Sequence, residues 1–181
     1  MHPTLSHCGV LAFDPIAPRD VSVVLEHARA LQLAAEAGGL RTLLRGRKLG
    51  LLCEIHSNDD TNADTDTDTE IEGDAALFRR AALELGAHVA HIRPSLNGLS
   101  TPHEVQHTAS MLGRLYDAVE CQGMAADLVH RMGVDAGVPV YDGVASKRHP
   151  TARLVDLLDG DASARDKRRF VLQAVLLSTI A

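Results

Sequence analysis

The sequence from His149 to Leu157 is His-Pro-Thr-Ala-Arg-Leu-Val-Asp-Leu, shortly after the apolar run at residues 138–141. The apolar run predicts a buried strand, and the His-Pro-Thr turn leads into an amphipathic segment that predicts a helix over residues 149–158. An imidazole and several backbone N–H groups are therefore expected where a strand ends and a helix begins. Such a position suits a small anion, because a helix N-terminus carries unpaired donors and partial positive charge.

Strand-like and helix-like segments alternate outward from this turn. Apolar runs predict strands at residues 48–54, 87–92, 117–121 and 138–141. Amphipathic or capped segments predict helices at residues 19–37, 74–85, 101–112, 125–132, 149–158 and 166–180. This order predicts an α/β fold, a three-layer sandwich in which a four-stranded parallel sheet lies between helices. Ligands of such folds bind at the carboxyl ends of the strands.

The composition is that of one globular domain spanning residues 1–181. Apolar residues make up 45% of the chain and aromatic residues 3%, so the core is expected to be aliphatic. A net charge of −6 gives a nucleic-acid partner no electrostatic support. No apolar run approaches membrane-spanning length, so no membrane contact is expected. Three cysteines and no signal-peptide pattern fit free thiols and a cytoplasmic location.

Residues 57–73 are acidic and alternate Asp with Thr. Repulsion between carboxylates and the scarcity of apolar side chains predict a solvated loop insertion here. Asp64, Asp66 and Asp68 have the opening spacing of a calcium loop, but Thr69 and Ala75 stand where that motif needs Gly and Glu. The solvated loop is therefore preferred over a calcium site.

The helix expected after Thr101 contains the spacing His-Glu-x-x-His, formed by His103, Glu104 and His107. On a helix the two imidazoles share a face and could bind Zn²⁺, with Glu104 as general base. The same glutamate completes a capping box with Thr101, and no third ligand follows at a typical spacing. The capping role is preferred, and the zinc hydrolase is kept as an alternative. No metal and no cofactor are expected.

Several segments together resemble the aspartate/ornithine carbamoyltransferase family. The His-Pro-Thr turn and the Leu-Val-Asp-Leu that follows it carry the most specific part of the likeness, although Ala152 replaces the family's Gln. The likeness continues through residues 44–52, 81–89, 107–118 and 138–143. It implies a carbamoyl-phosphate-binding domain closed by a C-terminal helix at residues 166–180, with the family's second, amino-acid-binding domain missing.

The resemblance also implies the site. It assigns substrate contacts to Ser57, Gln122, His149, Pro150 and Thr151, with His149 as the catalytic group that polarises the carbonyl. In the family, a Ser-Thr-Arg-Thr-Arg loop follows the position that corresponds to Glu54. This chain has Ser57 and the acidic segment in place of that loop. Gln122 replaces an arginine and His107 an aspartate. A pocket without guanidinium groups and fringed by carboxylates is expected, and it would hold a dianionic donor poorly. His149 alternatively only caps the following helix.

Three functions follow from these observations. The preferred one is a carbamoyltransferase-like protein of amino acid metabolism that has become a pseudoenzyme with a binding, scaffolding or regulatory role. The alternative is an enzyme that transfers the carbamoyl group of carbamoyl phosphate with residues supplied by a partner chain. The zinc hydrolase is third. Expected partners are carbamoyl phosphate or another small anion, an active carbamoyltransferase, and copies of this chain in a homotrimer, with residues 93–98 reaching a neighbour's site.

Overall fold

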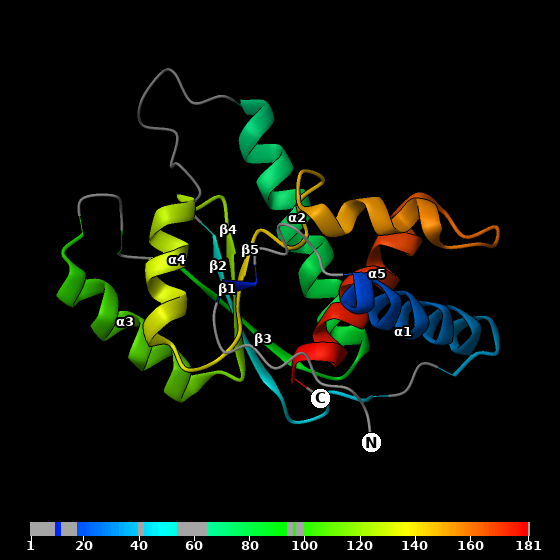
Figure 1. Ribbon diagram of the computed structural model, residues 1–181, viewed down its shortest axis with the longest axis horizontal. Coiled ribbons are helices and arrows are strands. Elements are labelled where there is room, and N and C mark those ends of the chain that lie inside the picture. Colours follow the sequence, from blue (N-terminus) through cyan, green and yellow to red (C-terminus); the bar gives the residue numbers. More distant parts are fainter. Residues whose placement is uncertain are drawn as a thin grey trace.

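The structure is a computed structural model that describes residues 10–11, 18–39, 42–53, 65–93, 96 and 100–180. Its strands and helices alternate along the chain (Figure 1). The strands are β1 (Val10–Leu11), β2 (Lys48–Cys53), β3 (His88–Ile92), β4 (Ala118–Gln122) and β5 (Val140–Asp142). The helices are α1 (Pro18–Glu36), α2 (Thr65–Glu84), α3 (Pro102–Leu115), α4 (Ala126–Asp135), the 3₁₀-helix η1 (Pro150–Leu157) and α5 (Ala164–Ile180).

The strands form one parallel sheet in the order β1-β5-β4-β2-β3. The four predicted strands are confirmed, and β1 adds a fifth at one edge. Two residues are too few to give a periodic signal, so the sequence did not reveal β1. From β2 the chain passes to β3 on one side and then returns to β4 on the other. The strand order therefore reverses between β2 and β4, which is where such sheets bind ligands.

Helices cover both faces of the sheet, as the sandwich prediction requires. Figure 1 shows α3 and α4 on one side and α1, α2 and α5 on the other. Two separate apolar clusters fill the layers. The larger includes Leu49, Phe78 and Tyr141 beneath α1, α2 and α5, and the smaller includes Leu52 and Leu128 beneath α3 and α4. Alternate residues of β2 enter opposite clusters, because side chains of a strand alternate between its faces.

Helix α5 packs back on the domain, chiefly against α1 and α2. Arg169 of α5 pairs with Glu84 of α2 and with Asp166 in its own first turn. Buried Gln173 also donates to the Glu84 carboxylate, at 2.9 Å. These contacts fix the first turns of α5 beside the C-terminal end of α2. None of the described helices combines the length and apolar character needed to cross a bilayer.

The predicted acidic loop at residues 57–73 is wrong for its second half. Residues 65–73 are the first turns of α2, which begins at Thr65 rather than at Asp74. Carboxylates in the first turn stabilise a helix by facing the positive end of its dipole, so the Asp/Thr pattern is compatible with a helix start. The buried Phe78 and Ala81 farther along anchor the helix to the core. Residues 57–64 lie outside the described part of the chain.

The helix expected over residues 149–158 is a 3₁₀-helix, η1. Its turns close between residues three apart, as in the bonds from Ala152 N to His149 O and from Leu158 N to Val155 O. Tight turns of this kind are common in short connectors, where little intrahelical bonding is available to favour the α form. Periodicity alone did not separate the two helix types.

Candidate functional site

A pocket of about 440 Å³ opens at the carboxyl edge of the sheet. The ends of β4 and β5, the N-terminal half of α2 and the turn before η1 surround it. The described residues lining it are Glu70, Ile71, Asp74, Gln122, Gly123, Asp142, Gly143, Ser146, Arg148, His149 and Pro150. It therefore lies beside the reversal of strand order, where the topology alone would place a ligand.

Gln122 ends β4 and is only 3% exposed. It sits opposite Cys53, the last residue of β2. Its side-chain nitrogen donates to an Asp74 oxygen at 3.3 Å. The opposite orientation of the amide would set its oxygen against that carboxylate, so the observed orientation is the favourable one. The amide oxygen makes no hydrogen bond with any described residue.

His149 occupies the N-cap position of η1 and is buried. Its Nδ1 accepts from the backbone N–H of Thr151 at 3.3 Å and lies 2.8 Å from the Thr151 hydroxyl. Pro150 occupies the first helical position, where its missing N–H costs nothing. The imidazole is therefore held by hydrogen bonds within its own turn, and its position in the pocket lining depends on the position of η1.

Arg168 of α5 supplies a buried guanidinium behind this turn. It donates to the Thr151 hydroxyl at 2.9 Å and to the backbone carbonyls of Val144 and Ser146. Burial lowers the pKa of Arg168 to about 10, against the opposing influence of Asp74 and Glu120. A guanidinium remains protonated at neutral pH with such a pKa. The side chain thus ties α5 to the loop that shapes the pocket.

Three carboxylates line the pocket, those of Glu70, Asp74 and Asp142. Burial raises the pKa of Asp74, although Lys147 and Arg168 act in the opposite direction. Burial also raises the pKa of Asp142. No lysine or arginine nitrogen of the described residues lies within ion-pair distance of any of the three. The pocket wall therefore carries three carboxylates that no described ion pair neutralises, although Lys147 and Arg168 act on Asp74 at longer range.

Glu120 lies below the pocket on β4 and has no exposed surface. Burial raises the pKa of this carboxyl well above its usual range, and Asp142 adds to the effect. The backbone amides of Val144 and Ala145 and the Arg168 guanidinium favour its charged form. None of them makes a hydrogen bond of standard geometry with its oxygens. We therefore attribute the net effect to burial, which favours the protonated acid.

Replacing Glu120 with glutamine is expected to flatten the dependence of stability on pH. A folded-state pKa above the ordinary 4.5 means that the native protein binds the proton more tightly than the unfolded chain. The stabilisation is therefore complete below pH 4.5 and is lost as pH rises through the folded-state pKa. Urea denaturation at a series of pH values measures it, with the exposed Glu72→Gln as control. Parallel curves for wild type and Glu120→Gln would contradict the assignment.

The sequence-predicted site residues divide into three groups. Gln122, His149 and Pro150 line the pocket, whereas Thr151 is fully buried behind it. Ser57 lies outside the described residues, as does most of the expected loop at residues 93–98. The expectation of a pocket without guanidinium groups is wrong, because Arg148 lines it and Arg168 lies behind it.

Sequence reasoning missed Glu70, Asp74, Asp142, Arg148 and Arg168. Glu70 and Asp74 are four residues apart, so they share a helix face, but the signal was lost because Glu70 was assigned to a loop and Asp74 to the start of the next helix. Asp142 lies within the family-like segment at residues 138–143, and Arg148 directly precedes the His-Pro-Thr turn, but neither gave a separate signal. Arg168 is brought to the site only by the packing of α5.

The zinc hydrolase alternative is not supported. His103, Glu104 and His107 are exposed on α3, in the layer across the sheet from α2. Glu104 accepts from the backbone N–H and the hydroxyl of Thr101, at 2.7 and 2.8 Å, which confirms the predicted capping box. These hydrogen bonds lower the pKa of Glu104. Within the described ranges, no group of three or more His, Cys, Asp or Glu side chains could hold a metal ion.

Curated relatives of known activity resemble this chain over most of its length. The catabolic ornithine carbamoyltransferase of Chromobacterium violaceum is 34% identical over 142 residues, which cover 78% of this chain and 38% of the relative. Ornithine carbamoyltransferase of Actinobacillus pleuropneumoniae is 33% identical over 140 residues, which cover 77% of this chain and 38% of that relative. The chain thus spans less than half the length of these relatives. No protein-family model matches it.

Solved structures show the same fold. Ornithine carbamoyltransferase from Pyrococcus furiosus superposes with a TM-score of 0.64 at 21% identity, covering 85% of this chain and 45% of that one. Ornithine carbamoyltransferase from Burkholderia thailandensis gives a TM-score of 0.61, also at 21% identity, and the match covers 83% of this chain and 47% of that one. The parallel sheet agrees with the fold of these structures, the curated relatives confirm the resemblance found in the sequence, and the chain belongs to the carbamoyltransferase family.

Proposed function

We propose that this protein is a pseudoenzyme of the carbamoyltransferase family, a binding domain that no longer transfers carbamoyl groups efficiently. The observation that carries the proposal is the set of carboxylates on the pocket wall, Glu70, Asp74 and Asp142. Two unit charges about 4 Å apart interact by about 4 kcal/mol near a protein surface. Repulsion of this size against a doubly charged phosphate would offset much of the attraction from Arg148.

The link between η1 and α5 supports the same proposal. Only residues 158–163 separate these helices. The resemblance expects the amino-acid-binding domain at this point of the chain. Without it the protein would hold no acceptor amine near the donor, and transfer needs both reactants in near-attack geometry. A regulatory or scaffolding role, exercised in a homotrimer or beside an active carbamoyltransferase, is part of this proposal.

Titration calorimetry with carbamoyl phosphate tests the proposal. We expect no saturable binding below about 1 mM, an affinity of about −4 kcal/mol. The double variant Asp74→Asn, Asp142→Asn keeps the shapes of both side chains and removes their charge. It is expected to bind carbamoyl phosphate at least about tenfold more tightly than wild type, because one repulsive interaction of this kind exceeds 1.4 kcal/mol. Micromolar binding by wild type, or carbamoylation of ornithine or aspartate, would overturn the proposal.

A second candidate function is an active transferase completed by a partner chain. His149, Arg148 and Arg168 favour it, because an imidazole and two guanidinium groups remain at or behind the pocket. The chemistry would be attack of an amine on the carbamoyl carbon, with His149 polarising the carbonyl and phosphate leaving. Activity that appears only when an active family member is mixed with this chain, and is lost in His149→Ala, would favour this candidate.

A further inference from the structure

We propose that the pocket at the carboxyl edge of the sheet binds a cationic nitrogen group, an ammonium or guanidinium carried by a small molecule. The proposal rests on the proposed function in one respect: a pocket that still bound the carbamoyl phosphate dianion would not also favour a cationic ligand. It goes further by naming the chemical class that replaces the anion. The acceptors on the wall, their charge and their spacing each support it.

The first support is the side-chain oxygen of Gln122. This residue is buried and lines the pocket, yet its amide oxygen has no donor among the described residues. Its nitrogen is occupied by Asp74, which fixes the oxygen as the free acceptor. The oxygen lies on the Gly143 side, since a Cβ built at Gly143 would stand 3.9 Å from it. A buried acceptor left without a donor costs free energy, and a ligand N–H would recover it.

The second support is the charge of the wall. Glu70, Asp74 and Asp142 present carboxylates that accept no ion pair from any described cation. Arg168 acts on Asp74 electrostatically, but its hydrogen bonds go to the Thr151 hydroxyl and to two backbone carbonyls rather than to that carboxylate.

Two further basic residues must be counted against a cation. Arg148 lines the pocket and Lys147 acts on Asp74, but both side chains belong to exposed residues of the turn before η1. Solvent and salt screen exposed charges, those of Arg148 and Lys147 and that of Glu70 alike, whereas the half-buried Asp74 and Asp142 are screened less. The inner wall therefore favours a positive ligand.

The third support is the spacing of the acceptors, which separates an organic cation from a metal ion. Metal ions need three or more ligands converging on one point, and the described residues contain no such group of His, Cys, Asp and Glu side chains. Ammonium and guanidinium groups carry three to five N–H donors directed outward, so they can bridge acceptors that do not converge. A volume of about 440 Å³ is that of a small-molecule pocket.

Titration calorimetry of the full chain with methylguanidinium and with methylammonium, at low ionic strength, tests the proposal. We expect saturable binding of at least one of them, which weakens as salt is added. Asp142→Asn and Gln122→Leu are each expected to weaken it about tenfold, the loss of one charge-assisted hydrogen bond. Preference for methylguanidinium would indicate a planar, bidentate subsite, and preference for methylammonium a point-charge subsite; either supports the proposal.

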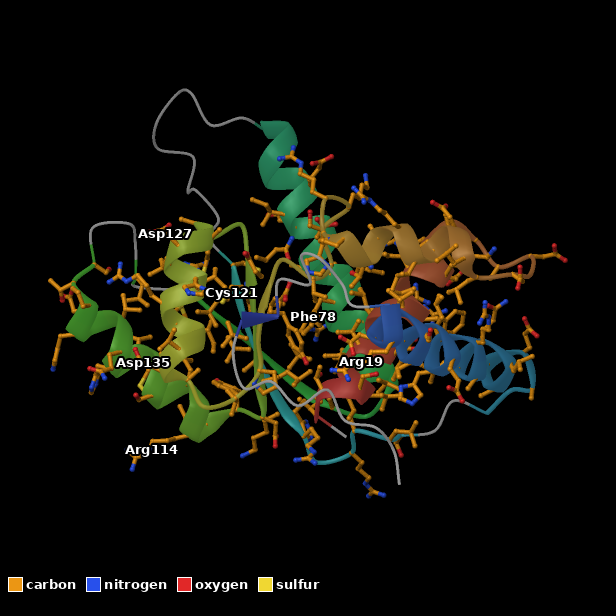
Figure 2. All side chains as sticks on the ribbon, in the orientation of Figure 1. Arg19, Phe78, Arg114, Cys121, Asp127 and Asp135 are labelled. Carbon is orange, nitrogen blue, oxygen red and sulfur yellow. The ribbon has the colours of Figure 1, made fainter. Side chains whose placement is uncertain are left out.

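Asp135→Asn is the matched control. Asp135 ends α4, in the layer on the other side of the sheet from α2 (Figure 2). This variant makes the same charge change away from the pocket, and its affinity should stay within about twofold of wild type. If Gln122→Leu fails to fold, Gln122→Arg takes its place. Its tethered guanidinium should fill the subsite and abolish binding of the added cation.

The outcomes separate this inference from the proposed function. If neither cation binds and carbamoyl phosphate also fails to bind, the cationic site is overturned while the pseudoenzyme proposal stands. If carbamoyl phosphate binds tightly, the pseudoenzyme proposal falls, and absence of cation binding would then overturn both. Cation binding that survives unchanged in Asp142→Asn and in Gln122→Arg lies elsewhere on the protein and also overturns the site.

Discussion

Replacing Arg168 with methionine is expected to lower the free energy of unfolding by about 1–3 kcal/mol, the cost typical of leaving a buried polar group without its hydrogen-bond partner. Arg168 is 7% exposed. Methionine fills similar space but removes the donor that Arg168 gives to the Val144 carbonyl. The Thr151 hydroxyl and the Ser146 carbonyl each lose one partner and keep their contacts with His149. A buried acceptor loses its hydrogen bonds to water on folding, and without a protein donor that loss is not offset. Urea denaturation at neutral pH measures the loss.

Two variants give the Arg168 experiment its controls. Arg165→Met removes an exposed guanidinium from the same helix and should change stability by no more than about 0.5 kcal/mol. Arg168→Lys keeps the charge but loses the planar fork, so it should fall between wild type and Arg168→Met. A stability for Arg168→Met equal to that of Arg165→Met would show that the guanidinium does not hold α5 to the pocket loop.

Replacing Gly113 with alanine is expected to cost about 1–3 kcal/mol, because overpacking a close helix contact forces backbone to move. Gly113 lies in α3, and a Cβ there would stand 1.8 Å from the carbonyl oxygen of Ala136 at the end of α4. No rotamer change relieves this collision, since both atoms belong to the backbone frame. The two helices must separate, which opens the apolar cluster beneath them.

Gly73→Ala is the matched control for Gly113→Ala. Gly73 lies within α2, and a Cβ there meets nothing within 4 Å. The alanine should therefore raise stability by about 0.5–1 kcal/mol through helix propensity alone. Both substitutions add one methyl group to a helical glycine, so the difference between them isolates the collision. Thermal melts followed by circular dichroism measure it. Equal melting shifts would mean that α3 and α4 lie farther apart than described.

The sequence predicted the sheet because the apolar runs of β2, β3, β4 and β5 are short and separated by amphipathic segments. It predicted the start of α3 because Thr101 and Glu104 form a capping box whose hydrogen bonds are entirely local. It also placed Gln122 and His149 at one edge, since parallel strands bring their carboxyl ends together. The family resemblance rested on motifs of the same local kind, and curated relatives confirm it.

The sequence did not predict where α2 begins, because an Asp/Thr repeat suits a solvated loop as well as a helix N-terminus, and only packing of the later turns decides between them. It did not predict Arg168 at the site. That guanidinium is 17 residues from Thr151 along the chain, and the return of α5 across the domain brings them together. Local patterns determined the elements and the edge of the sheet at which the pocket lies. The charges that face one another in the pocket were decided by tertiary packing, because long-range electrostatics depends on distances that no local spacing encodes.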